Sequence, residues 1–387
     1  MPRLLIAQPQ SLFDRSSGAA VSMRHLGCLL AGRGWEVRAV CTSASEDGRR
    51  AAPRPDDDLG GMRVQQITLP EGTARDWARH DGGRFEAAVM RALTQSQPDL
   101  LLTFGADPLE HRLCTAARKQ GVPVLLALHN LAYRDLGLPL PPADGLLLPS
   151  QFMARAYADV PLPALVLPPP LWPADVQVTT HDPVFATFVN PEPEKGARLV
   201  ARLAALRPNW PLLVVQGRAG AGRFAAAVRD VGGEPATLPQ VHEVPGGVPV
   251  RELLAVTRVL LMPSRVAEAA GRLAAEAVAN GIPTLVSARG GLPEMVEGCG
   301  TVIEGDPEDP ATAAHWAQAL DRLQDDAGWG AAAALARQAS TRWQAAVQAA
   351  AADDALRRWL NAAAGRVRPG PAPASAVGAA TPDRPAP

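Results

Sequence analysis

The chain of 387 residues is poor in aromatic residues, in paired cysteines and in long apolar runs. Phe, Trp and Tyr make up 4% of it and all hydrophobic residues 47%, so its core must consist mainly of Ala, Leu and Val. The four cysteines form no Cys-x-x-Cys pair, which supports neither a disulfide framework nor a zinc knuckle. No apolar run approaches the roughly 20 residues of a membrane helix.

The chain also lacks an excess of charge of either sign, with 38 Lys and Arg against 39 Asp and Glu. A net charge of −1 leaves no basic footprint, so we expect no nucleic-acid partner. The apolar segment 4–7 is too short for a signal peptide and predicts a first strand. These features favour a cytoplasmic protein, and they leave open a peripheral contact with the inner membrane face.

Strand and helix patterns alternate along the chain. In the first half, apolar segments alternate with helical patterns at 19–31, 85–94 and 110–119; the apolar segments are 4–7, 37–41, 63–68, 100–104, 122–128, 146–148 and 165–167. In the second half, a helical pattern at 196–206 accompanies the apolar segments 184–189, 212–216, 253–256, 259–262, 284–287 and 301–303. The alternation predicts an α/β fold with two Rossmann-like, doubly wound domains.

The three prolines 168–170 predict a stiff extended linker between the halves. We therefore expect an N-terminal domain over 1–170 and a C-terminal domain over 171–345. A C-terminal helix over 346–364 could pack back on the N-terminal domain. The remaining segment, 365–387, is rich in Pro, Ala and Gly and predicts a disordered tail.

The most informative segment is 263–283, which follows the apolar run 258–262. Glu268 and Glu276 stand on either side of Gly271, and the residues around Glu276 have a helical pattern. A helix N-terminus presents free N–H groups and suits an anion. Carboxylates accept hydrogen bonds from sugar hydroxyl groups. A phosphate site between two polyol sites indicates a nucleotide sugar as the ligand.

This segment resembles the Glu-x7-Glu motif of retaining GT-B glycosyltransferases, glycosyltransferase family 4 in particular. The matching residues are Pro263-Ser264, Glu268, Gly271, Glu276-Ala277 and Gly281-Ile282-Pro283. Ala269-Ala270 replaces the usual Pro-Phe, and the following segment 287–294 is again similar to the family. The resemblance implies two domains that face each other across a cleft, with the acceptor on the N-terminal side and the donor on the C-terminal side.

The resemblance also implies roles for single residues. Glu268 would hold the donor sugar, and Glu276 would hold the ribose. Lys195, in a Lys-Gly pair similar to that of the family, would neutralise the departing diphosphate. Further donor contacts would come from the segment between the two glutamates, at Ala270, Gly271, Arg272 and Leu273.

One departure from the family pattern concerns the diphosphate. Asn190 stands where many members carry an arginine. Either Lys195 acts alone, or Arg218 or Arg272 supplies the second cation. Near the N-terminus, Ser17 and Gly18 occupy the position of the family's Gly-Gly-Ala donor loop, although Ser17 is equally suited to cap a helix.

Two further features leave alternatives open. His129 follows the strand pattern 122–128, where the family often has a histidine that positions the donor sugar or the acceptor; it could equally be a structural histidine. The run Asp56-Asp57-Asp58 is similar to a metal-binding Asp-x-Asp, but a solvated run of charges fits its loop better. We therefore expect no catalytic metal and no cofactor other than the sugar nucleotide as co-substrate.

The sequence thus predicts a retaining, metal-independent, hexosyltransferase-type enzyme that uses a nucleoside diphosphate sugar. Its acceptor, whether a glycan, a lipid-linked molecule or a small molecule, stays open. One alternative is a nucleotide-sugar epimerase of the same fold, and another is a non-catalytic, glycosyltransferase-like regulatory subunit. A nicotinamide-dependent dehydrogenase is disfavoured because the chain lacks G-x-G-x-x-G at its first strand.

Overall fold

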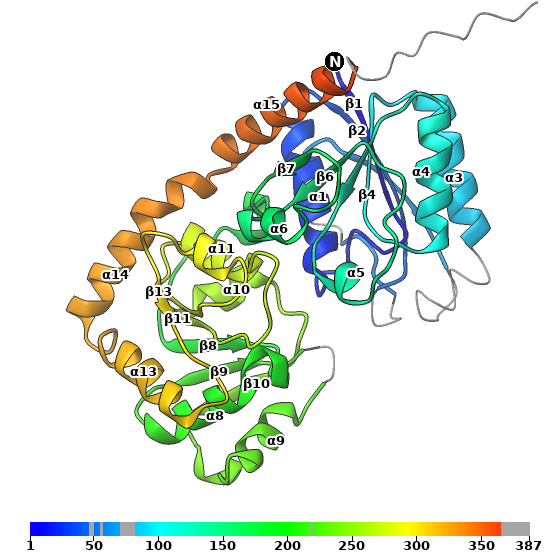
Figure 1. The fold of residues 1–387 in the computed structure, drawn as a ribbon. Coiled ribbons are helices and arrows are strands. Elements are labelled where there is room, and N and C mark those ends of the chain that lie inside the picture. The colour runs from blue at the N-terminus through cyan, green and yellow to red at the C-terminus, as the bar shows by residue number, and fades with distance from the viewer. Residues whose placement is uncertain (46–49, 55–56, 70–81, 218–219, 365–387) are drawn as a thin grey trace, which may run out of the picture.

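The computed structural model of the chain describes residues 1–45, 50–54, 57–69, 82–217 and 220–364, which form two α/β domains (Figure 1). Each domain has one sheet, and all paired strands named below are parallel. Parallel strands that are covered on both faces consist of nearly continuous apolar residues. The predicted pair of doubly wound domains is confirmed.

The N-terminal sheet has the strand order β3-β2-β1-β4-β5-β6-β7. Its strands are β1 (Arg3–Gln8), β2 (Glu36–Thr42), β3 (Arg63–Ile67), β4 (Leu100–Thr103), β5 (Val124–Ala127), β6 (Gly145–Leu148) and β7 (Ala164–Val166). The helices between them are α1 (Gly18–Ala31), α3 (Gly82–Ser96), α4 (Pro108–Lys119), α5 (Ala132–Asp135) and α6 (Gln151–Ala156). Alternate residues of β1 enter different cores: Leu5 packs with α3 and α4, and Leu4 packs with α1.

The C-terminal sheet has the order β10-β9-β8-β11-β12-β13. Its strands are β8 (Phe185–Val189), β9 (Leu212–Val215), β10 (Val241–Val244), β11 (Thr257–Met262), β12 (Thr284–Ser287) and β13 (Thr301–Ile303). The helices α8 (Ala197–Leu206), α9 (Arg223–Asp230) and α13 (Pro310–Asp321) share a core with one face. On the other face lie α10 (Val250–Ala255) and α11 (Arg272–Ala279).

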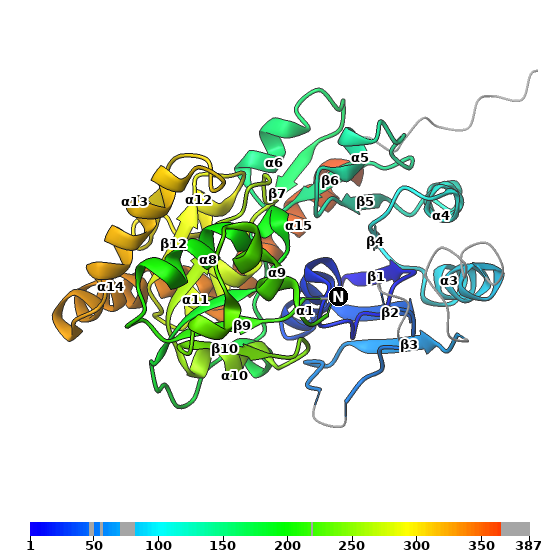
Figure 2. The same cartoon turned by 90° about the horizontal axis from the view of Figure 1, so that it is seen from below.

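The chain crosses between the two domains twice. The first crossing is the linker, which leads into α7 (Pro173–Val176). Within the C-terminal domain, α12 (Leu292–Met295) lies beside α11. After α13, α14 (Asp326–Ala339) and a 3-10 turn (Ser340–Trp343) lead into α15 (Ala345–Ala364), which returns to the N-terminal domain (Figure 1). Leu356 of α15 is buried in the same core as α1, and Trp35 Nε1 donates to Asp353 Oδ1 at 2.7 Å. Figure 2 shows α13 and α14 at one end of the molecule and α3 and α4 at the other.

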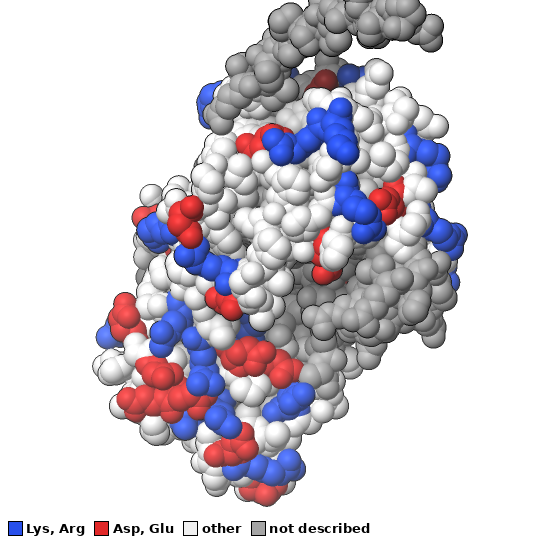
Figure 3. All heavy atoms as spheres, turned by 45° about the vertical axis from the view of Figure 1, so that its right-hand side comes forward, with Lys and Arg blue, Asp and Glu red and all other residues white. Residues whose placement is uncertain are grey.

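Two local expectations need correction. The apolar segment 253–256 is no strand: α10 ends at Ala255, and it buries Leu253 and Leu254. The strand β10 went unpredicted because it is an edge strand that pairs with β9 alone and has exposed polar residues. Among the described residues, no helix combines the length and the apolar character needed to cross a bilayer. On the face drawn in Figure 3, acidic and basic side chains are interspersed.

Candidate donor site between the domains

The predicted donor residues lie where the strand order of the C-terminal sheet reverses. Lys195 follows β8 and Glu268 follows β11, and these two strands are neighbours at the reversal. In open α/β sheets, ligands bind at the carboxyl ends of such strands. Gly196 brings the two loops together at φ 87°, because a Cβ there would lie 2.1 Å from the carbonyl oxygen of Pro263. The reversal therefore places both predicted groups side by side at one edge of the sheet.

The side chains of Lys195 and Glu268 form an ion pair in which Nζ lies 2.5 Å from Oε1. Ser264 Oγ donates to the same oxygen at 2.5 Å. Both members of the pair keep contact with solvent, with side-chain exposures of 29% and 17%. A cation and a carboxylate thus stand together at the head of α11, where they can meet a phosphate and a sugar hydroxyl.

Glu276 lies further along α11 and is paired with Arg272. Arg272 Nε is 2.8 Å from Glu276 Oε1, and the two side chains are 13% and 7% exposed. Burial raises the pKa of Glu276, and the Arg272 guanidinium opposes that shift. Gly271, the residue before α11, has φ 94°, and a Cβ there would meet Leu292 Cδ2 at 2.3 Å. Glycine is thus required for the close approach of this loop to α12.

Arg272 reaches across to the N-terminal domain. Its Nη1 donates to Ser22 Oγ at 3.1 Å and to the carbonyl of Pro170 at 2.8 Å, and its Nη2 lies 2.7 Å from His25 Nδ1. Arg272 was one of two arginines predicted to supply a second cation for the diphosphate. Its guanidinium is instead occupied by contacts to Glu276, α1 and the linker.

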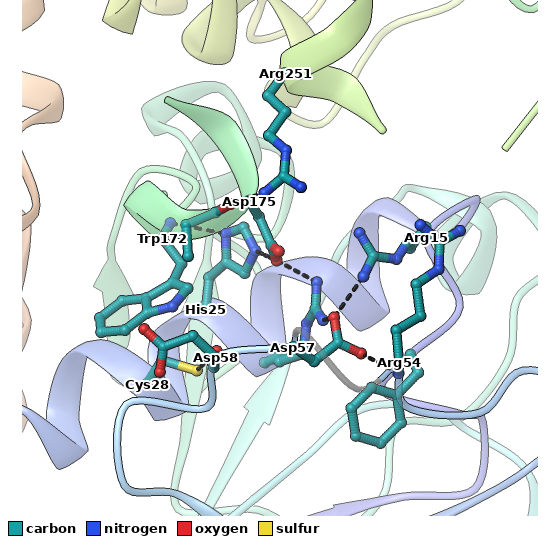
Figure 4. A network of polar contacts seen from close by, with 12 residues as sticks. Arg15, His25, Cys28, Arg54, Asp57, Asp58, Trp172, Asp175 and Arg251 are labelled. Atoms are coloured by element: carbon teal, nitrogen blue, oxygen red, sulfur yellow. Dashed lines mark hydrogen bonds and ion pairs between the residues drawn. The ribbon is translucent and has the colours of Figure 1, made fainter. Parts of the chain in front are cut away.

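His25 continues this network on α1. The backbone N–H of Trp172 donates to Nδ1 at 2.9 Å, so Nδ1 is an acceptor, and Nε2–H donates to Asp175 Oδ2 at 2.7 Å. Burial and the neighbouring Arg272 lower the pKa of His25 to about 3, so the ring is neutral at ordinary pH. Figure 4 shows the imidazole pointing at the Asp175 carboxylate.

One residue of the acidic run before Gly60, Asp57, also belongs to this network, contrary to the expected solvated charges, whereas Asp58 is exposed as expected. Asp57 is 3% exposed and pairs with Arg15 and with Arg24, which also pairs with Asp175 (Figure 4). Arg15 and Arg24 cover the Asp57 carboxylate from solvent and neutralise it. The acidic run alone does not show that these partners exist. Asp58 Oδ1 accepts from the N–H of Gly60 at 2.8 Å, and Asp56 lies outside the described residues.

His129 lies at the end of β5, on the N-terminal side of the same junction. Its ring packs edge-on against Phe104, with 5.8 Å between centroids. Nε2 is buried and has no hydrogen-bond partner within the described residues. Burial, with a smaller contribution from Arg272, lowers the pKa of His129 to about 4. The ring is therefore neutral at ordinary pH, and it is not an imidazolium that could act as a general acid.

The remaining predicted donor residues differ in what they offer. Ser17 Oγ caps α1 by accepting from the N–H of Ala20 at 3.4 Å, and nothing lies within 4 Å of a Cβ built on Gly18. The cap and an open approach for a ligand are therefore compatible. Asn190, at φ 63°, rests its Oδ1 against Gly217, where a Cβ would be 1.7 Å away. Arg218 lies outside the described residues.

The segment between the two glutamates presents backbone to the crevice. Ala270 is buried in one core cluster and Leu273 packs against another, so these side chains serve packing. Three polar residues near this segment went without a predicted role, namely Ser264, Ser150 and Glu294. Ser150 Oγ donates to the carbonyl of Ala269, and Glu294 accepts from the N–H groups of Gln151 and Phe152, each at 2.7 Å. Ser264 belongs to the segment 263–283 and Glu294 to the segment 287–294, both of which resemble the family. Their places in these segments were the signal that could have identified them.

Metal ligands do not gather at this site. Across the part of the chain that the structure describes, no group of three or more His, Cys, Asp or Glu side chains is arranged to hold an ion. Within the described residues, Lys195, in the loop after β8, and Arg272, on α11, are two cations of the predicted donor segment, and each is paired with a glutamate.

Comparison with protein families matches each half of the chain separately. Residues 17–162 match the glycosyl transferase 4-like domain, and residues 186–326 match glycosyl transferases group 1. Comparison with curated proteins gives no match. The two family matches and the fold together support a glycosyltransferase of the GT-B type.

Solved structures of similar fold cover nearly the whole chain. Sucrose-phosphate synthase from Thermosynechococcus elongatus is 21% identical with a TM-score of 0.69, over 94% of this chain and all of that one. HepE from Anabaena, solved with UDP-glucose, is 16% identical with a TM-score of 0.65, over 92% and 99%. Trehalose 6-phosphate synthase from Burkholderia multivorans is 16% identical with a TM-score of 0.59, over 96% and 99%.

The Arg272–Glu276 pair allows a test of its structural weight. Arg272→Met should lower the free energy of unfolding by about 3–5 kcal/mol, because it leaves the Glu276 carboxylate buried without its partner. The double variant Arg272→Met/Glu276→Met should recover part of that loss, because no charge is then left unpaired. Urea denaturation of the three proteins measures both. A double variant no more stable than the single one would contradict this account.

The buried histidines predict a pH dependence of stability. The unfolded chain takes up a proton on His129 below pH about 6.5, while the folded chain resists protonation until about 4. The free energy of unfolding should therefore fall as the pH is lowered through this window, by up to about 1.4 kcal/mol per pH unit for this group. His129→Gln should flatten the slope in urea denaturations between pH 6.5 and 4. The exposed His315→Gln variant is the control and should keep the wild-type slope.

Proposed function

We propose that the chain is a retaining, metal-independent glycosyltransferase of the family 4 kind that transfers a hexose from a nucleoside diphosphate sugar to a hydroxyl group of an acceptor. The observation that carries the proposal is the Lys195–Glu268 pair at the strand reversal, with Nζ 2.5 Å from Oε1. Glu276, on the helix that begins at this point, supplies a second carboxylate. One cation and two carboxylates match the diphosphate, the sugar hydroxyls and the ribose hydroxyls of such a donor.

Each group has one task in this proposal. The Lys195 ammonium binds the diphosphate and stabilises the negative charge that grows on it as the glycosidic bond breaks. Glu268 accepts hydrogen bonds from hydroxyls of the transferred sugar, and Glu276 accepts them from the ribose. The N–H groups at the head of α11 face the phosphates.

The reaction needs no further reagent. A bond forms between the acceptor oxygen and the anomeric carbon as the bond from that carbon to the diphosphate oxygen breaks. The acceptor proton passes to the departing phosphate oxygen, which yields a glycoside and a nucleoside diphosphate. Attack from the face that the diphosphate leaves preserves the anomeric configuration. His129, neutral at ordinary pH, would position a hydroxyl and transfer no proton.

The nucleotide and sugar need a direct screen. HepE was solved with UDP and with UDP-glucose, which makes UDP-glucose the first donor to test. A ligand that binds only the folded state raises the melting temperature. A panel of UDP-, GDP- and dTDP-sugars should therefore contain at least one that raises it, and an unchanged melting temperature with every member at millimolar concentration would contradict the proposal.

Lys195 and Lys119 are the only lysines of the chain, which gives a matched pair of variants. Lys195→Ala should lower kcat at least about 100-fold, as expected for a lost stabiliser of transition-state charge. Lys119→Ala, at the exposed end of α4, should keep the wild-type rate. Initial rates of nucleoside diphosphate release with a donor found in the screen decide the matter. A wild-type rate in Lys195→Ala would remove the assigned role.

Metal independence has its own test. Transfer should continue at an unchanged rate after dialysis against EDTA, because Lys195 and the head of α11 supply the positive charge that a divalent ion supplies in other enzymes. Loss of activity in the chelator, restored by Mg²⁺ or Mn²⁺, would contradict this part of the proposal.

A further inference from the structure

The residue that follows Glu268 is held by the N-terminal domain. Ser150, at the start of α6, is 1% exposed, and its Oγ donates a hydrogen bond to the carbonyl of Ala269. The side chain of Ala269 packs against the core cluster of the N-terminal domain that contains Leu148 and Met153. Ala269 itself belongs to the C-terminal domain. The backbone next to the proposed sugar-binding carboxylate is therefore bonded across the domain boundary.

Glycines in the loop before α12 bring a second segment against the same backbone. The N–H of Gly291 donates to the carbonyl of Glu268 at 2.7 Å. A Cβ on Gly290 would lie 2.2 Å from that carbonyl oxygen. A Cβ on Gly291 would lie 2.6 Å from the carbonyl oxygen of Ala269 and 3.0 Å from Ser150 Oγ. The glycine loop, the backbone after Glu268 and the Ser150 hydroxyl therefore converge at one point.

The glycine loop leads into α12, whose Glu294 contacts α6 directly. Glu294 accepts from the N–H of Gln151 at Oε2 and from the N–H of Phe152 at Oε1, each at 2.7 Å. A helix leaves such N–H groups unpaired at its start. Arg342, in the 3-10 turn before α15, donates to the carbonyl of Met295 at 2.7 Å and so holds α12 as well. In Figure 1, α6 lies on the side of the N-terminal domain that faces the C-terminal domain.

The position of this backbone decides where the Glu268 carboxylate stands once a donor is bound. In the structure, the carboxylate is bonded to Lys195 Nζ and to Ser264 Oγ. In the proposed function, the diphosphate of the donor takes over Lys195. The carboxylate then depends more on its own backbone for its direction, and that backbone is the one seated against Ser150.

The contact between α6 and α12 is also better placed to break and form again than the contact made by Arg272. The Glu294 side chain is 27% exposed, whereas those of Arg272 and Glu276 are 13% and 7% exposed. Where α6 separates from α12, water can bond to the Glu294 carboxylate and to the two N–H groups, so the net cost is small. Arg272 holds the domains together near the linker in either case.

We propose that Ser150 and Glu294 are positioning residues for the transfer: together they seat α6 on the backbone of Glu268 and so direct the carboxylate that holds the transferred sugar. The inference rests on the proposed function and adds a control to its donor site. The C-terminal domain binds the nucleotide through Lys195 and Glu276 whether or not α6 is seated. The sugar is held in its reacting position only while α6 is seated, so the two residues affect the reaction rate more than the affinity for nucleotide.

The first experiment separates rate from nucleotide affinity, using UDP-glucose or whichever sugar nucleotide the thermal screen identifies. Ser150→Ala and Glu294→Ala should each lower kcat for nucleoside diphosphate release at least about tenfold and change the Kd of the nucleoside diphosphate less than about twofold. Asp325→Ala is the matched control. Asp325 accepts from the N–H of Gly328 at the start of α14, as Ser150 accepts from that of Met153, so this variant loses an equivalent helix cap and should keep the wild-type kcat.

Two outcomes of these rate measurements would overturn the proposal. One is a wild-type kcat in either Ser150→Ala or Glu294→Ala. The other is a loss of the same size in Asp325→Ala, because the effect would then follow from lost helix stability alone.

The double variant Ser150→Ala/Glu294→Ala tests whether the two residues act through one contact. Its kcat should lie within about twofold of that of the slower single variant, because the loss of either residue already unseats α6. A loss equal to the product of the two single losses would mean that they act separately, which contradicts the proposal.

Amide hydrogen exchange tests the contact without any donor. Glu294→Ala should raise the exchange rates of the N–H groups of Gln151 and Phe152 at least about tenfold, because their acceptor is lost. Glu297→Ala, at an exposed glutamate just after α12, is the control and should leave both rates unchanged. Unchanged rates in Glu294→Ala would overturn the contact itself. Failure of every sugar nucleotide to bind would instead overturn the proposed function, and the exchange rates would still report on the contact.

Discussion

The contacts of one guanidinium hold the two domains and the donor-side carboxylate in place. Arg272 is buried among Glu276, Ser22, Pro170 and His25, at distances of 2.7 to 3.1 Å. A buried charge is stable only when its hydrogen bonds and its counter-charge are supplied together. A movement of one domain relative to the other would remove some of these partners and leave the buried charge without its hydrogen bonds. The position of Glu276 and the junction of the domains are therefore fixed by the same interaction.

The same cation sets the chemistry of the imidazoles near it. Burial lowers the pKa of His25 to about 3 and that of His129 to about 4, and Arg272 makes a smaller contribution in the same direction. Both rings are neutral at ordinary pH, and pKa values this low also make them weak bases. A weak base is a poor acceptor for the proton of an attacking hydroxyl, which is consistent with the proposed transfer of that proton to the leaving phosphate.

Much of the fold could be predicted because parallel strands covered on both faces appear as apolar runs. Lys195 and Glu268 could be placed together because the loops after neighbouring strands share one edge. The partners of charged residues could not be predicted in this way. Asp57 is neutralised by Arg15 and Arg24, which are distant in the sequence, and the Nη groups of Arg272 bond to residues of α1 and the linker. A charge in the sequence does not show whether its partner is solvent, a ligand or another domain.

The two donor-side carboxylates are compensated in different ways, and this difference suits a site that must bind and release its ligand. The Arg272–Glu276 pair is buried and shared with the N-terminal domain, so separating it is costly. The Lys195–Glu268 pair is less buried, at 29% and 17% side-chain exposure, and joins two loops of one domain. In the proposed function, a diphosphate would therefore replace Glu268 as the partner of Lys195 more easily than any ligand could separate Arg272 from Glu276. In the proposed donor site, the buried pair would hold α11 against the N-terminal domain, and the less buried pair would exchange its partners for those of a bound donor.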